Sequence, residues 1–215
     1  MLKVISSLLV CCSFLTSVEA QKKEYLVEYK GTSLPRDTAQ EPLSLIMAFS
    51  QKRSYMKMIL EDVETVMITD AKEQKSLILM QMMGMKLGTS IEGSDYAKID
   101  FMKDFVNDFT LENTKQKRKI LGYNCNLILA HPKEGKEPFQ IWYTEDLAVV
   151  GTFNLTAYGS KINGLPLLMT WKQEDNSTIQ WQAIRINTSR PDKALFDLSL
   201  PYGYSLISSD LFLND

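Results

Sequence analysis

Alternating apolar and polar residues dominate the sequence and predict β-strands. Between Glu24 and Lys30, Tyr25, Val27 and Tyr29 fall on one face of an extended chain, which is typical of a strand with one buried side. Four further apolar or β-branched runs, separated by polar breaks, predict a meander of antiparallel strands. These runs are 43–49, 54–60, 64–69 and 76–83. The segment 31–42 contains two prolines and is predicted to be a loop.

Two hairpins are predicted in the second half of the chain. The alternation over 123–129 stops at a turn over 131–138 and resumes over 139–143. The segments 162–172 and 178–187 form the arms of the second hairpin. In its second arm the apolar positions change face near Ala183, which predicts a β-bulge there.

Helical patterns are confined to two short segments. Phe101, Phe105 and Phe109 recur at helical spacing behind Asp100, a suitable N-cap, and 191–195 fits one helical turn. Strands do not alternate with helices, so a doubly wound fold is not expected. The residues predict a mainly β (α+β) protein built on an antiparallel sheet or open barrel.

The first 20 residues predict a secretory signal peptide. Lys3 precedes an apolar run from Val4 to Leu15, and small residues precede Ala20. The run is too short to span a bilayer, and nothing similar follows it, so no transmembrane segment is expected. Cys11 and Cys12 leave a lipoprotein signal as the alternative. Cleavage after Ala20 would leave 21–215 as a single β domain, exported to the periplasm or secreted.

Charge and cysteine content narrow the function classes. The chain has 24 basic and 26 acidic residues, spread along its length, so nucleic-acid binding is not expected. Only Cys125 lies outside the predicted signal peptide, so the mature chain cannot form an internal disulfide.

Side chains suited to catalysis are scarce. The single histidine, His131, lies in a predicted turn, and Cys125 lies among apolar residues on a strand, so neither a catalytic pair nor a zinc set is indicated. Residues 88–93 begin and end with glycine and are interpreted as a turn. We predict that the protein is not an enzyme and has no catalytic, cofactor-binding or metal-binding residues. A hydrolase using paired carboxylates, such as Glu145 and Asp146, is the minor alternative.

Methionine is the conspicuous residue type, with 11 in the chain. Methionine is flexible and polarizable, so a sheet face lined with it can adapt to apolar ligands of varied shape. Ordinary core filling is the competing interpretation. The candidate ligand-cavity residues are Met56, Met58, Met67, Met80, Met82, Trp142 and Trp181.

A series of short motifs in the second half resembles an exported bacterial domain family of unknown function, common in Bacteroidetes and related to the GLPGLI proteins. Leu167 stands where the GLPGLI signature has glycine, which favours the unknown-function family. The motifs are Ile120-x-Gly122-Tyr123-x-Cys125, Gly135-Lys136, Trp142-Tyr143-Thr144 with Asp146, Asn163-Gly164-Leu165-Pro166-Leu167, Leu195-Phe196 and Pro201-x-Gly203-Tyr204.

This resemblance implies a fold like that of the lipoprotein carriers LolA and LolB. Such a fold is a strongly curved antiparallel sheet or half-open barrel, with one or two short helices over an apolar cavity that receives acyl chains. The expected function is an exported periplasmic binding or carrier protein for an apolar ligand, either a lipid or a lipoprotein acyl chain. The alternative is a non-catalytic envelope module that binds an unknown protein partner. No functional residue is carried over from the carriers.

Overall fold

Residues 24–34, 43–93, 109–133, 137–149, 162, 164–172 and 177–209 are described by the computed structural model. Within these ranges the chain forms twelve β-strands and one short 3₁₀ helix, η2. The strands are β1 (Tyr25–Leu34), β2 (Leu43–Ser50), β3 (Arg53–Leu60), β4 (Val63–Asp70), β5 (Lys75–Met82), β6 (Met85–Glu92), β7 (Phe109–Ile120), β8 (Tyr123–Pro132), β9 (Phe139–Thr144), β10 (Leu165–Lys172), β11 (Thr178–Asn187) and β12 (Ser205–Leu206), and η2 is Lys193–Phe196.

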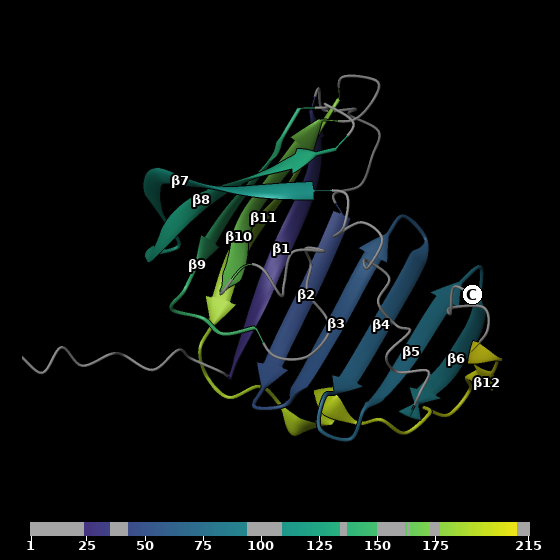
Figure 1. Ribbon diagram of the computed structural model, residues 1–215. Coiled ribbons are helices and arrows are strands. Elements are labelled where there is room, and N and C mark those ends of the chain that lie inside the picture. Colours follow the sequence, from purple (N-terminus) through teal and green to yellow (C-terminus); the bar gives the residue numbers. More distant parts are fainter. Residues whose placement is uncertain are drawn as a thin grey trace, which may run out of the picture.

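All twelve strands join one sheet, in the order β12-β6-β5-β4-β3-β2-β1-β11-β10-β9-β8-β7 (Figure 1). Each strand pairs antiparallel with its neighbours, except that β12 lies parallel to β6. Strand β1 is the junction: on one side it pairs with the meander β2–β6, and on the other with β11, which continues to β7.

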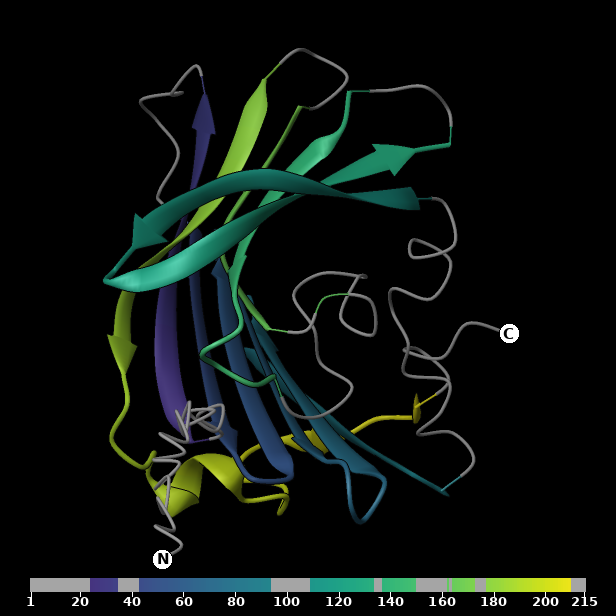
Figure 2. The same ribbon diagram turned by 60° about the vertical axis from the view of Figure 1, so that its left-hand side comes forward.

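The sheet is strongly curved and open. Figure 2 shows β1–β6 bending into a trough, with the long β7–β8 hairpin arching across its end. Bulges contribute to this curvature, because an extra residue in one strand bends that strand and increases its twist. Register shifts occur opposite Glu28/Tyr29, between Pro166 and Leu168, and between Asn113 and Lys117.

The main apolar core covers the concave side of the sheet and, on β8 and β9, also includes residues of the opposite face such as Leu127 and Trp142. Val27, Met47 and Met56 alternate with residues of the opposite face, and they belong to one buried cluster with Ile128 and Ile141 from the other half of the sheet. Adjacent strands connect these residues without a break, because Trp181, Met169, Ile141 and Ile128 pair in succession from β11 to β8. This cluster holds most of the buried apolar side chains of the described residues, and their removal from water stabilises the fold.

A second, smaller cluster covers the convex face of β4 and β5. It consists of Val66, Ile68, Leu77 and Leu79, packed against residues of the C-terminal segment such as Leu198. That segment leads from η2, at the β2–β3 and β4–β5 turns, along the sheet to β12 (Figure 1).

Gly88 on β6 lets this C-terminal segment approach the sheet. A Cβ atom built on Gly88 would lie 2.4 Å from Cδ1 of Leu200 and 3.1 Å from Cδ2 of Leu79. Such distances are shorter than van der Waals contact, so a larger residue would push Leu200 away. Just beyond, the amide of Ile207 donates a hydrogen bond to the carbonyl oxygen of Gly88 at 2.9 Å.

Most of the predicted strands are confirmed. The four predicted strands of the meander correspond to β2–β5, and the two predicted hairpins to β8–β9 and β10–β11. The bulge near Ala183 is also confirmed, because Tyr29 pairs with Ala183 and Glu28 with Arg185, which leaves Ile184 as the extra residue. The helical turn predicted over 191–195 corresponds to η2, Lys193–Phe196.

Four sequence-based assignments are wrong, at least in part. The turn predicted over 131–138 is one of them, because His131 and Pro132 are the last two residues of β8. Residues 31–34, predicted as loop, continue β1, and residues 88–92, interpreted as a turn, belong to β6. The charged stretch 115–119, which was not assigned to a strand, lies within β7. The rest of the predicted loop, 35–42, and the predicted helix up to residue 108 lie outside the described residues, whereas Phe109 begins β7.

The contact between Gly88 and Leu200 can be tested by a double-mutant cycle. We expect Gly88→Val to lower the free energy of unfolding by about 1–3 kcal/mol, because overpacking displaces neighbouring side chains. Leu200→Ala in the same chain should recover part of this loss, since it removes the clashing atoms. Urea unfolding of both single variants and the double variant gives the coupling. Strictly additive effects would show that the Cβ at position 88 does not meet Leu200.

Candidate functional site

Five candidate methionines share the concave face of β3–β5. Met56 pairs with Met67 across β3 and β4, and Met58 and Met80 both pair with Thr65, so all four lie on one face. Met82 alternates with Met80 along β5 and points the same way. The strand period of two, combined with this register, therefore produces one continuous methionine face.

One end of this face is closed. In the row nearest η2, Ser54, Thr69 and Ser76 pair across β3–β5 and are at most 2% exposed. The hydroxyls of Thr69 and Ser76 are hydrogen-bonded at 3.0 Å, whereas Oγ of Ser54 is buried without a partner among the described residues. In the next row, Met56 and Met67 are each 5% exposed.

Exposure increases towards the opposite end of the same strands. Met58, Met80 and Met82 are partly exposed. Beyond them, at the β3–β4 and β5–β6 turns, Leu60 is 36% and Met85 50% exposed. The apolar face is therefore buried at one end of these strands and partly accessible at the other.

The two candidate tryptophans lie on opposite faces of the sheet. Trp181 pairs with Gly31 on β1 and packs over it, so it extends the methionine face towards β11. Trp181 also pairs with Met169, which pairs with Ile141. Trp142, the residue after Ile141, therefore points the other way. The register thus brings six of the seven candidate residues to one surface and places Trp142 elsewhere.

Trp142 is buried and contacts an exposed arginine on β7. The guanidinium carbon of Arg118 lies 4.3 Å from the centre of the Trp142 ring. Arg118 also lines a polar pocket of about 440 Å³ with Lys117, Lys119, Asn124, Asn126, Glu145 and Asp146. A guanidinium over an aromatic face stabilises both groups, and this role explains the position of Trp142 without a ligand.

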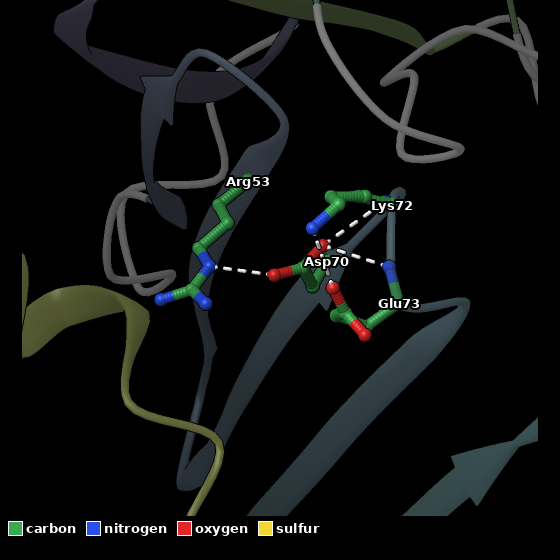
Figure 3. Close-up of polar contacts among 4 residues, drawn as sticks. All are labelled: Arg53, Asp70, Lys72 and Glu73. Atoms are coloured by element: carbon green, nitrogen blue, oxygen red, sulfur yellow. Dashed lines mark hydrogen bonds and ion pairs between the residues drawn. The ribbon is translucent and has the colours of Figure 1, made fainter.

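A second polar pocket, of about 320 Å³, lies at the closed end of the sheet, between the β2–β3 and β4–β5 turns and η2. Its central carboxylate, Asp70, is 3% exposed and occupies the last position of β4. One oxygen of Asp70 accepts a 2.7 Å hydrogen bond from Nε of Arg53. The other accepts the backbone amides of Lys72 and Glu73 at 2.9 and 3.0 Å (Figure 3).

These hydrogen bonds determine the ionisation of Asp70. Burial alone would raise the pKa of the carboxyl group, but the amide of Glu73, the guanidinium of Arg53 and the amide of Lys72 together hold this pKa below its ordinary value. A carboxylate with a depressed pKa in the folded protein stabilises the fold above the ordinary aspartate pKa of about 3.9. That contribution is lost as the pH falls through the folded-state pKa.

The two potentially reactive side chains considered in the sequence, His131 and Cys125, both lie on β8. His131 lies at the end of β8, 2.8 Å from a carboxylate oxygen of Glu112, with 40% of its side chain exposed. Cys125 is buried, and burial raises the pKa of its thiol, which disfavours the reactive thiolate. Within the described part of the chain, no three His, Cys, Asp or Glu side chains are grouped as a metal site.

The fold and the concave surface define a class of protein, an open, curved antiparallel sheet with an apolar inner face. The sequence matches the domain of unknown function DUF4412 over residues 32–204, and the chain belongs to this family. No curated protein matches the sequence. In the ranges that the structure describes, no helix is long and apolar enough to cross a membrane.

Solved structures with a similar arrangement share little sequence with this chain. PNGF-II matches with a TM-score of 0.50 and 16% identity over 88% of this chain, which spans only 32% of PNGF-II. MucB, in complex with MucA(peri), matches with a TM-score of 0.47 and 9% identity, covering 87% of this chain and 57% of MucB. The LolA superfamily protein NE2245 from Nitrosomonas europaea matches with a TM-score of 0.35 and 6% identity, covering 82% and 90%. At such identities the similarity to PNGF-II concerns the fold alone.

The role of Asp70 can be tested through the pH dependence of stability. We expect Asp70→Asn to lower the free energy of unfolding at pH 7 by roughly 1.5–3 kcal/mol, because charge-assisted hydrogen bonds are lost. The difference between wild type and variant should shrink as the pH falls below about 4, where the wild-type carboxylate is progressively protonated. Urea unfolding at a series of pH values measures both effects. A deficit that is unchanged at low pH would contradict the assigned charge.

Proposed function

We propose that this protein is an exported, non-catalytic carrier or binding protein for an apolar ligand, either a lipid or the acyl chain of a lipoprotein. The observation that carries the proposal is the methionine face, which passes from buried to accessible along one side of a curved sheet. Methionine side chains change shape at little cost, so such a face suits ligands of varied acyl length.

Export follows from the predicted signal peptide over residues 1–20. In this proposal the mature chain, 21–215, is a single domain that works in the periplasm or outside the cell. A bacterial source in Bacteroidetes and a relation to the GLPGLI proteins belong to the same proposal. So does the absence of catalysis.

An envelope protein-interaction module is the second candidate function. It is favoured by apolar side chains exposed near the end of the described chain, where Tyr202 is fully exposed and Leu206 is 70% exposed. Exposed aromatic and aliphatic groups of this kind are common at protein interfaces. In this case the methionine face would be packed core and would bind no ligand.

Charge substitutions on the methionine face distinguish these functions. We expect the protein to bind an uncharged fluorescent long-chain monoacylglycerol saturably, and Met80→Glu or Met82→Glu to weaken this binding about tenfold or more. The introduced carboxylate would have to lose its water against the acyl chain, and the neutral probe excludes simple charge repulsion. Fluorescence titration measures the affinity.

Met83→Glu is the matched control. Met83 directly follows Met82 but lies in the β5–β6 turn with 87% exposure, so the same charge there should leave the affinity unchanged. Thermal unfolding of each variant shows whether it is folded. No saturable binding by the wild type, or equal weakening by all three substitutions, would contradict an apolar ligand on this face.

A further inference from the structure

We propose that the pocket beside Asp70 binds a phosphate group, carried either by a small soluble ester or by a lipid headgroup. This site is separate from the methionine face and does not depend on the function proposed for it. The pocket, of about 320 Å³, is larger than a phosphate ion needs, so it leaves room for part of the attached molecule.

Positive side chains from four parts of the chain converge on this pocket. Lys52 and Arg53 come from the β2–β3 hairpin, Lys72 from the β4–β5 turn, Arg190 from the segment after β11, and Lys193 from η2. The acidic lining residues are Asp70 and Glu73, so five positive charges surround two negative ones. This local excess of positive charge contrasts with a net charge of −2 for the whole chain.

The carboxylates in and beside the pocket already have partners. Asp70 is hydrogen-bonded to Arg53 and to two backbone amides. Glu73 lies 3.2 Å from the ammonium of Lys72, and Glu24, next to the pocket, lies 3.8 Å from Nε of Arg190. Among the described residues, Lys52 and Lys193 form no ion pair, so their charges are the ones available to an incoming anion.

Arg53 is positioned in advance for such an anion. Its Nε atom bonds to the buried carboxylate of Asp70, and its two terminal nitrogens point away from that carboxylate (Figure 3). Half of the Arg53 side chain, 49%, is exposed. A guanidinium held at one edge presents its remaining N–H groups in a fixed fork, which matches the geometry of phosphate oxygens. Lysine side chains around it then act as adaptable point charges.

Calorimetric titration of the full mature protein with glycerol 3-phosphate at constant ionic strength tests the site. We expect saturable binding that Lys52→Gln and Lys193→Gln each weaken about tenfold, as expected for losing one charged contact. Two independent variants keep the test valid if one of them unfolds. Lys30→Gln, on β1 and outside the pocket lining, is the control with the same change of charge and should bind as the wild type does.

Vesicles distinguish the two sources of phosphate. Sedimentation with phosphatidylglycerol vesicles, but not with phosphatidylcholine vesicles, that is lost in Lys193→Gln would identify an anionic lipid headgroup. Saturable binding of glycerol 3-phosphate without vesicle binding would identify a small soluble ester. The proposal is wrong if neither probe binds, or if Lys30→Gln weakens binding as much as the pocket variants do, because the attraction would then be diffuse.

Discussion

Tyr29, on the central strand β1, donates a 2.8 Å hydrogen bond from its buried hydroxyl to the carbonyl oxygen of Pro166 on β10. Strand β11 lies between β1 and β10 in the sheet, so this bond reaches past one strand to the next. Tyr25 lies earlier on the same strand and the same face. Its hydroxyl donates a hydrogen bond of 3.0 Å to the carbonyl oxygen of Ala148. Burial raises the pKa of both phenols, so both remain neutral hydrogen-bond donors at ordinary pH.

These two bonds tie β1 to β10 and to the segment that follows β9, across the intervening strand β11. A buried phenol without a partner would lose free energy, so the carbonyl oxygens of Pro166 and Ala148 must stay within reach of β1. The curvature of the sheet creates a concave side, and residues that alternate along the strands give this side an apolar surface. The methionine face therefore depends on the curvature of the sheet as well as on the residues of β3–β5 themselves.

Local sequence patterns were sufficient to predict much of this fold. Alternation over 24–30 and 123–129 and apolar runs such as 54–60 predicted strands, and the change of parity near Ala183 predicted a bulge in β11. The shared face of Met56 and Met67 also follows from alternation once the strands pair in a meander. Long-range contacts were not accessible in this way. Gly88 resembles a turn glycine in sequence, but it accommodates Leu200 from a distant segment.

The arrangement of the candidate-site residues could not be predicted from local sequence patterns either. Trp142 and Trp181 look equivalent in sequence, and only the pairing of Trp181 with Met169, and of Met169 with Ile141, shows that they face opposite ways. Asp70 resembles an ordinary turn residue, and its burial depends on Arg53 across the hairpin pair and on η2 nearby. The positive pocket gathers side chains that are more than 100 positions apart, which a local motif does not reveal.

The most direct measurement is native mass spectrometry of the mature protein, purified gently from its own source, followed by organic extraction and identification of the released molecules. If the methionine face carries an apolar ligand, the spectrum should show a stoichiometric adduct that extraction releases as a lipid or an acylated peptide. A mass equal to the bare polypeptide, unchanged after incubation with envelope lipids, would contradict the carrier function.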